Sequence, residues 1–353
     1  MRRLKSILFV AVAFLAASTG KVSAQQVFKT TSASKIAFYE YVPADYNSNS
    51  NKYPVVIFLH GIGERGPNTT DLATLEANIY KVAKLGPPMH VKNGYKFPFI
   101  LISPQLKSNY GTWPSSYVME VINYVKTYLR IDERRIYITG LSLGGGGTWV
   151  TIQDYPELFA AALPVCGGYN SPSKAYKIAA ENLPVWASHG SIDDVVPMSK
   201  TVNMVNAINA STPKPSPLAK LTIYTGVKHN AWSYAYRTDH SLHTPNVYEW
   251  MMSFTNTVNK GNKIPVANAA TDQTKYLTSA TSTVIYGAAT DADGTIATYE
   301  WTKISGPTST LSGTTTKTLK VSGLKKGTYV FRLKVKDNTG NTDSDYVKVT
   351  VKD

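Results

Sequence analysis

A Gly-x-Ser-x-Gly pentapeptide, Gly140 to Gly144, constrains the fold of this 353-residue chain more than any other feature. The residues before it (135–139) have the apolar, β-branched composition of a buried strand, and the residues after it, through Val150, can form a helix. A strand that turns directly into a helix crowds its own backbone, so positions two before and two after the turn need glycine. The pattern therefore predicts that Ser142 lies at a sharp turn with its hydroxyl exposed at a sheet edge.

Short apolar runs alternate with amphipathic stretches between about Val27 and Phe254. A continuous apolar run such as Val55–Leu59 is expected for a strand that is covered on both faces, whereas 118–129 carries apolar side chains at helical spacing. We therefore predict an α/β fold with a doubly wound, mostly parallel sheet and helices on both faces. An antiparallel entry strand is expected at 36–42.

The pattern changes after Asn256, where a polar stretch is followed by strict alternation of apolar and polar residues. Tyr329, Phe331, Leu333 and Val335 share one face of such a strand, which is typical of a β-sandwich. The predicted organisation is a signal peptide (1–24), an α/β catalytic domain (25–258), a linker (259–264) and a small all-β sandwich (265–353).

The N-terminal segment has the features of a secretory signal: basic residues, an apolar run over 7–17 and small residues before a cleavage site after Ala24. The apolar run is too short to span a membrane. We expect a cleaved signal, no membrane span and an extracellular or periplasmic location. Cys166 is the only cysteine, so an internal disulfide is excluded, and its apolar surroundings favour a small buried side chain over a nucleophile.

The formal net charge is +14, but the Lys and Arg residues are not clustered in a dense run and no nucleic-acid motif is present. Nucleic acid is therefore not an expected partner. The basic surface fits an acidic polysaccharide and scattered solvated lysines equally well. The pattern does not specify an oligomeric state.

Serine becomes a nucleophile when a base takes its proton and a carboxylate orients that base. Asp193 follows the apolar run 185–187 and His229 follows the run 221–224, so both lie beyond the carboxyl ends of predicted strands. With Ser142 they form a candidate catalytic triad, in which Asp194 is the alternative acid.

A tetrahedral oxyanion needs backbone N–H donors. We expect one from Leu143, directly after the serine, and one from Gly61 or Ile62 in the glycine-rich loop after the strand 55–59. Glycine-rich loops also bind phosphate, but here no Gly-Lys-Ser/Thr follows.

These segments together resemble the secreted carboxylesterase branch of the α/β-hydrolase fold, near the feruloyl esterases, acetylxylan esterases and polyhydroxybutyrate depolymerases. The matching motifs are His60-Gly61-x-Gly63-Glu64-Arg65-Gly66, Arg135 to Gly145 and the loops that carry Asp193 and His229. The stretch 190–197 is similar to the Gly-x-x-Asp-x-x-Val-Pro loop of serine esterases, and that register selects Asp193. A departure is the run of four glycines, 144–147, for which we expect close backbone packing.

The C-terminal segment resembles the polycystic-kidney-disease (PKD) type of immunoglobulin-like domain. The matching residues are Pro265 to Ala269, Asp291 to Ile296, Tyr299-Glu300-Trp301 and Gly327 to Leu333. Such domains are common appendages of secreted polysaccharide-degrading enzymes. Asp291 and Asp293 are candidate calcium ligands, although too few acidic residues lie nearby to favour calcium over a plain turn.

The combined hypothesis is a secreted serine carboxylesterase that removes acetyl or feruloyl groups from polysaccharide or hydrolyses small esters. Trp232, three residues after His229, is the candidate substrate-binding aromatic. No metal or organic cofactor is implied. The alternatives are a secreted serine peptidase of the same fold and a non-catalytic carbohydrate-binding protein.

Overall fold

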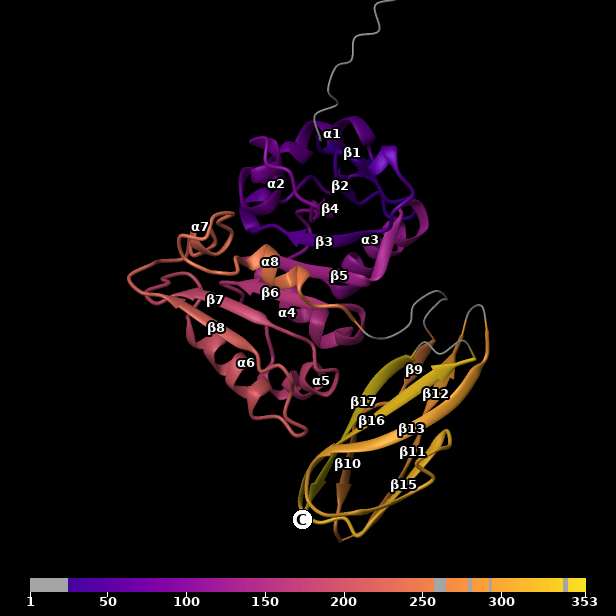
Figure 1. The fold of residues 1–353 in the computed structure, drawn as a ribbon. Coiled ribbons are helices and arrows are strands. Elements are labelled where there is room, and N and C mark those ends of the chain that lie inside the picture. Colours follow the sequence, from indigo (N-terminus) through magenta and orange to yellow (C-terminus); the bar gives the residue numbers. More distant parts are fainter. Residues whose placement is uncertain (1–24, 257–264, 279–280, 292–293, 339–341) are drawn as a thin grey trace, which may run out of the picture.

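The computed structural model describes residues 25–256, 265–278, 281–291, 294–338 and 342–353 (Figure 1). The predicted signal peptide (1–24), the predicted linker (259–264) and Asp293 lie outside the described residues, so these predictions stay untested.

An eight-stranded sheet forms the centre of the first part of the chain, which we call the α/β domain (Figure 1). One strand, β2 (Ala37–Tyr41), is antiparallel to both of its neighbours, and the other neighbouring strands pair in parallel. In spatial order the strands are β1 (Val27–Thr30), β2 (Ala37–Tyr41), β4 (Ile100–Pro104), β3 (Tyr53–Leu59), β5 (Ile131–Leu141), β6 (Ala161–Val165), β7 (Trp186–Gly190) and β8 (Lys220–Tyr224). The predicted doubly wound sheet and the antiparallel entry strand are confirmed.

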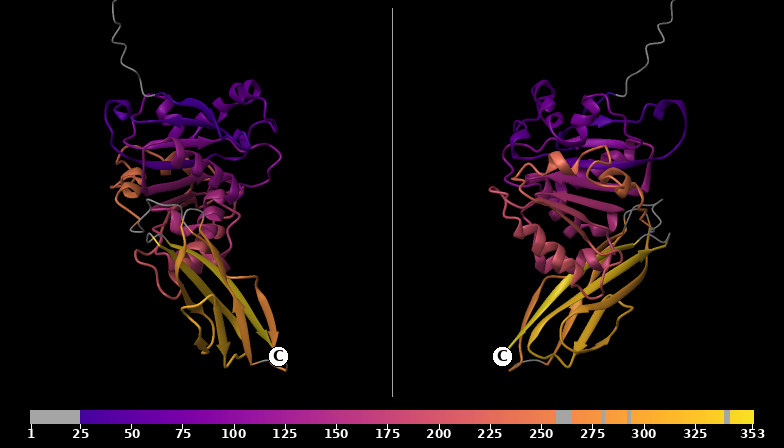
Figure 2. Two further views of the ribbon diagram at one scale, coloured as in Figure 1. Left: turned by 90° about the vertical axis from the view of Figure 1, so that its right-hand side faces the viewer. Right: turned by 60° about the vertical axis from the view of Figure 1, so that its left-hand side comes forward.

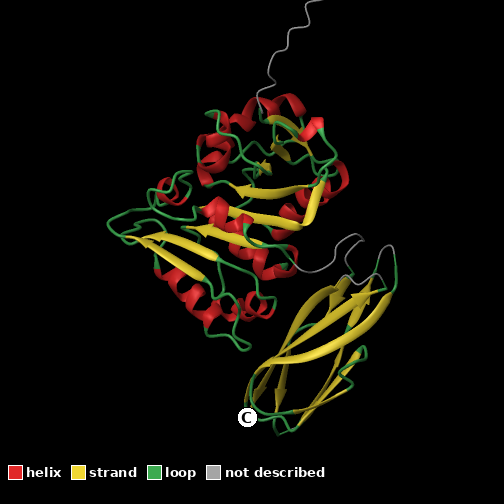
Figure 3. Cartoon of the chain, in the orientation of Figure 1, coloured by secondary structure: helices red, strands yellow, loops and turns green. Residues whose placement is uncertain are grey.

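Helices cover both faces of this sheet, and each face has its own apolar core (Figure 3). In β3, Val55, Ile57 and Leu59 belong to one core while Val56 and Phe58 belong to the other, as expected for a strand without a solvent face. One core is closed by α3 (Ser115–Tyr128), α4 (Leu143–Asp154), α5 (Ala175–Ala180) and α6 (Ser199–Asn209). The other is closed by α2 (Gly86–Lys92), α7 (Trp232–Ala235) and α8 (Val247–Met252), and α1 (Leu72–Ile79) packs on β2.

The C-terminal part of the chain is a sandwich of short strands with a third apolar core. Its larger sheet has the order β10 (Gln273–Tyr276), β17 (Thr342–Lys352), β16 (Gly327–Asp337) and β13 (Ile296–Ser305). The remaining strands are β11 (Ser282–Tyr286), β15 (Thr318–Ser322), β14 (Thr310–Ser312), β12 (Ala288–Thr290) and β9 (Val266–Asn268). The predicted apolar face of β16 is confirmed, because all four of its side chains are fully buried in this core.

The sandwich contacts the α/β domain through the other face of β16 and β17, which lies against α5 (Figure 2). Val330 and Tyr346 pack with Tyr176 of α5, whose ring meets that of Tyr346 edge-on at 5.0 Å. Arg332 lies 3.3 Å from Glu181 and donates to the carbonyl of Ala180. Part of the polar face of β16 is thus an interface rather than a solvent-exposed surface.

Among the described residues, no helix combines the length and the apolar character that crossing a membrane requires.

Candidate active site

Ser142 lies at the junction of β5 and α4, in a turn that few residues other than glycine adopt. Its φ is +53° and its ψ is −117°, and its backbone N–H donates to the carbonyl of Val165 at 2.9 Å. Left-handed backbone at a non-glycine residue is strained and persists only where its surroundings enforce it. The predicted sharp turn at Ser142 is therefore present.

The glycines around Ser142 are required by close backbone contacts. A Cβ added at Gly140 would lie 2.3 Å from the carbonyl oxygen of Gly144, and one added at Gly144 would lie 1.9 Å from that of Leu59. At Gly145 the nearest atom would be the carbonyl oxygen of Val165, at 2.3 Å. The expected packing of backbone on backbone is confirmed at Gly144 and Gly145, whereas the nearest atoms at Gly146 and Gly147 belong to the side chains of Tyr169 and Trp113.

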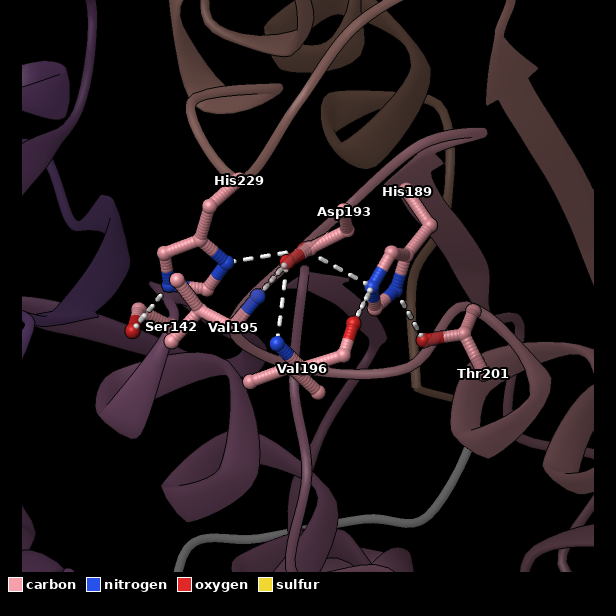
Figure 4. A network of polar contacts seen from close by, with 7 residues as sticks. All are labelled: Ser142, His189, Asp193, Val195, Val196, Thr201 and His229. Atoms are coloured by element: carbon pink, nitrogen blue, oxygen red, sulfur yellow. Dashed lines mark hydrogen bonds and ion pairs between the residues drawn. The ribbon is translucent and has the colours of Figure 1, made fainter.

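His229 joins the serine to a carboxylate. Its Nε2 lies 2.8 Å from Ser142 Oγ, and its Nδ1 lies 2.8 Å from Asp193 Oδ2 (Figure 4). Because the carboxylate can only accept, Nδ1 carries the ring proton and Nε2 is the acceptor for the serine hydroxyl. The His229 side chain is 16% exposed, so the imidazole is accessible from one side.

The side chain of Asp193 is fully buried and accepts hydrogen bonds from several donors. Its Oδ1 accepts from the backbone N–H groups of Val195 and Val196, both at 2.9 Å, while Oδ2 faces His229. Burial alone would raise the pKa of Asp193, but the hydrogen bonds from His229 and from the two backbone N–H groups outweigh it and lower the pKa. Asp194, the alternative acid, points elsewhere and pairs with Lys228 at 3.0 Å on the surface.

His189 approaches the same carboxylate from the opposite side (Figure 4). Its Nε2 lies 3.0 Å from Asp193 Oδ2, and its side chain is fully buried. His189 is not among the site residues predicted from the sequence. The signal that could have found it is its spacing, four residues before Asp193 at the end of a strand.

The loop after β3 lies beside Ser142 and is fixed by buried contacts. A Cβ added at Gly61 would lie 3.7 Å from Ser142 Cβ. His60 is buried, donates from Nδ1 to the carbonyl of Gly61 at 2.6 Å and accepts from the N–H of Leu106 at Nε2. Burial is the main cause that lowers the pKa of His60 to about 4, so its ring is neutral at pH 7.

Three backbone N–H groups around Ser142 were predicted as oxyanion donors. Leu143 begins α4, and the first N–H groups of a helix have no acceptor within the helix. Gly61 and Ile62 begin the short 3-10 turn Ile62–Glu64, which the Arg65 guanidinium ties to the carbonyls of Ser108 and Tyr110. The loop that carries Gly61 therefore lies next to Ser142, and the oxyanion role of Leu143, Gly61 and Ile62 stays a prediction.

The tryptophans of the α/β domain divide into core and site. Trp113, Trp149 and Trp186 are fully buried. Trp232 begins α7 and is partly buried, and its ring meets the His229 imidazole edge-on at a centroid distance of 5.1 Å. Trp250 of α8 is also partly buried and packs against Trp186, and Trp113 packs against His60. Trp232 is the tryptophan whose ring meets a member of the predicted triad.

Cys166 is fully buried next to the same residues. Burial first, and then the Asp193 charge, raise the pKa of its thiol to about 12. Among the described residues, Cys166, Asp193 and His229 have potential metal-ligand atoms within 4.8 Å of one another. Both ring nitrogens of His229 already contact Ser142 and Asp193, so an ion there would displace these hydrogen bonds.

Such an arrangement can transfer the serine proton to an imidazole while an acyl carbonyl is attacked, which is the chemistry of serine hydrolases. The family model described as Phospholipase/Carboxylesterase matches residues 46–238, more than half of the chain. This chain belongs to that family. The phospholipase/carboxylesterase match covers β3 to α7, and the α/β-hydrolase fold and a serine ester hydrolase activity are thereby supported as predicted. A second model, the K319L-like PKD domain, matches residues 269–351, which confirms the predicted C-terminal domain.

Parts of this chain are also similar to individual known proteins. Poly(3-hydroxyalkanoate) depolymerase C of Paucimonas lemoignei is 29% identical over 173 residues, 46% of this chain and 39% of that protein. A bifunctional acetylxylan esterase/xylanase of Neocallimastix patriciarum is 29% identical over 106 residues, 28% of this chain and 15% of that protein. The crystal structure of a thermostable esterase matches with 29% identity and a TM-score of 0.49, covering 66% of this chain and 63% of that one. The chain spans less than two thirds of each of these proteins.

Proposed function

We propose that this protein is a secreted carboxylesterase that hydrolyses esters through an acyl-enzyme on Ser142, with His229 as the base and Asp193 as the acid. The observation that carries the proposal is the unbroken line of contacts from Ser142 Oγ to His229 Nε2 and from His229 Nδ1 to Asp193 Oδ2, each 2.8 Å. The strained backbone of Ser142 and the family match add support.

In the proposed reaction, Ser142 Oγ attacks the ester carbonyl as His229 Nε2 takes its proton. The N–H groups of Leu143 and of Gly61 or Ile62 stabilise the oxyanion. His229 then gives the proton to the leaving alcohol. A water molecule, deprotonated by His229, attacks the acyl-enzyme, and the acid is released as Ser142 regains its proton.

An acylated polysaccharide is the proposed substrate, and a feruloyl group fits the site better than an acetyl group. Three large apolar side chains on loops near Ser142 are exposed: Ile62 (57%), Tyr169 (60%) and Val195 (65%). Tyr169 has a left-handed backbone with φ +57°, and its ring lies close to Gly146, in the first turn after Ser142. Exposed apolar groups beside a nucleophile favour an apolar or aromatic acyl group.

Export after cleavage near Ala24 and the division at 258 and 265 belong to the same proposal. They rest on the basic and apolar N-terminal pattern and on the change from mixed to all-β structure. In this division the PKD domain holds or stabilises the enzyme while the α/β domain performs the hydrolysis.

Hydrolysis of p-nitrophenyl acetate and methyl ferulate by wild type and Ser142→Ala tests the proposal. We expect Ser142→Ala to lose about 10⁴-fold or more in kcat, because no other group replaces the nucleophile. Ser115→Ala, a serine on α3 that donates to Asp154, is the matched control and should keep wild-type rates. Wild-type turnover that survives in Ser142→Ala would contradict the mechanism, and absence of any ester turnover would favour a carbohydrate-binding role.

A further inference from the structure

His189 ends β7 with its side chain fully buried, and its ring contacts three different groups (Figure 4). Nε2 lies 2.9 Å from the carbonyl oxygen of Val196 and 3.0 Å from Asp193 Oδ2. Nδ1 lies 2.8 Å from the hydroxyl of Thr201 in α6. A fully buried histidine that contacts a partner at each nitrogen is held in one orientation.

These partners determine the tautomer of His189. A carbonyl and a carboxylate can only accept hydrogen bonds, so Nε2 carries the proton and shares it between Val196 and Asp193. Nδ1 is then the acceptor, and Thr201 donates to it. Burial lowers the pKa of His189, which keeps this ring neutral and its single N–H in place at neutral pH.

The Asp193 carboxylate consequently lies between two imidazoles. Oδ2 faces His229 Nδ1 at 2.8 Å and His189 Nε2 at 3.0 Å, while Oδ1 is held by two backbone N–H groups of its own loop. Rotation of the carboxylate would break contacts on both oxygens at once. Among the described residues, other ionisable groups close to this carboxylate include the Cys166 thiol and the exposed pair of Asp194 and Lys228.

We propose that His189 is a positioning residue for the esterase reaction, which fixes the Asp193 carboxylate in the orientation that selects the His229 tautomer. The inference rests on the proposed function of Ser142, Asp193 and His229. It extends the line of contacts from the nucleophile through Asp193 and His189 to Thr201, so that α6 anchors the acid from behind.

Two substitutions of His189 separate positioning from simple packing. His189→Met fills much of the same volume but has no donor, whereas His189→Gln carries an N–H at a position close to that of Nε2. We expect His189→Met to lower kcat by about 10- to 100-fold, the range for a small misplacement of a reacting group. We expect KM to change less than threefold and His189→Gln to recover most of the lost rate.

The pH profile of kcat/KM gives a readout that packing alone would not move. Once relieved of one donor, the carboxylate attracts the imidazolium form of His229 more strongly. The acidic inflection of His189→Met should therefore shift to higher pH by roughly half a unit, while that of His189→Gln should stay near the wild-type position. A fluorophosphonate that labels Ser142 counts the folded, competent sites in each variant.

Equal rates for both variants, or an unchanged inflection in His189→Met with full labelling, would overturn the inference. Wild-type turnover that is abolished in Ser142→Ala together with an unaffected His189→Met would sink the positioning role alone. Wild-type protein without any ester turnover would instead sink the proposed function itself.

Discussion

Two carboxyl groups in this chain are buried beside different hydrogen-bond partners, and their pKa values shift in opposite directions. Asp193 in the α/β domain contacts His229, His189 and two backbone N–H groups, and its pKa is lowered. Asp343 on β17 is hydrogen-bonded to Glu157, another acid, and burial as the main cause raises its pKa to about 6. At Asp193 the hydrogen bonds outweigh burial, whereas at Asp343 burial outweighs the hydrogen bonds, including the one to Glu157.

The two sites also differ in what they join. Asp193 lies at the carboxyl ends of the parallel strands, where loops are free to carry chemistry. Asp343 lies between the sandwich and the α/β domain, where a hydrogen bond between two carboxyl groups requires a proton on one of them. The first arrangement suits a charged group in a reaction, and the second suits a pair of acids that shares one proton between the domains.

The largest expected effect is on the rate of hydrolysis and follows from a substitution of Asp193. Asp193→Asn should lower kcat by about 10⁴-fold without unfolding the protein, because an amide beside His229 Nδ1 favours the wrong imidazole tautomer. Steady-state hydrolysis of p-nitrophenyl acetate measures kcat, and circular dichroism shows whether the variant is folded. Asp194→Asn, one residue along on the surface, is the matched control, and an equal loss in that variant would refute the assignment.

A smaller effect is expected at Asp343, where the change should alter stability and not the rate of hydrolysis. Since the folded pKa of Asp343, about 6, exceeds the ordinary 3.8, the protonated acid stabilises the fold below pH 3.8, and this contribution is lost as the pH rises through 6. Asp343→Asn is always neutral and should be more stable than wild type at pH 8, on the order of 2 kcal/mol.

Thermal unfolding of wild type and Asp343→Asn at pH 4 and pH 8 provides the measurement. The difference in melting temperature should be clear at pH 8 and small at pH 4, and kcat should be unchanged. A difference of the same size at both pH values would mean that the shared proton with Glu157 does not govern the contact.

The smallest expected effect concerns the ion pair beside this contact. Arg332→Met removes the 3.3 Å contacts to Glu181 and Ala180 and should lower stability by about 1 kcal/mol, at the upper end for ion pairs that remain partly solvated. Lys336→Met, an exposed position on the same face of β16, serves as control. Differential scanning calorimetry compares the melting temperatures of the two variants. Equal values for Arg332→Met and Lys336→Met would show that the interface does not depend on Arg332.

Much of the α/β domain could be predicted because its signals are local. The apolar run of β3 and the Gly140 to Gly144 turn each report their environment within a few residues. The face of β16 that carries Val330 and Arg332 was predicted only as an alternating face, since its partner α5 lies about 150 residues earlier in the chain and leaves no trace in the strand's own pattern. Alternation identifies two faces but not what covers each of them.

In the candidate active site, too, local sequence signals predicted some residues, and contacts that depend on packing could not be predicted. Ser142, Asp193 and His229 could be proposed because each follows a strand run in an order typical of a known fold, and their side chains lie in contact. The contact of His189 with Thr201 could not be predicted, since it depends on how α6 packs against the end of β7. Spacing along the chain locates a loop, whereas hydrogen-bond partners depend on the packed structure.

Cys166 provides a natural probe of how often this region opens. The chain has one sulfhydryl, and it is enclosed beside Asp193. An alkylating reagent can reach it only when the surrounding loops separate, so the labelling rate under native conditions reports the frequency of that local opening. The alkylation rate of this native thiol therefore measures how often the region around Asp193 opens, and no engineered label is needed.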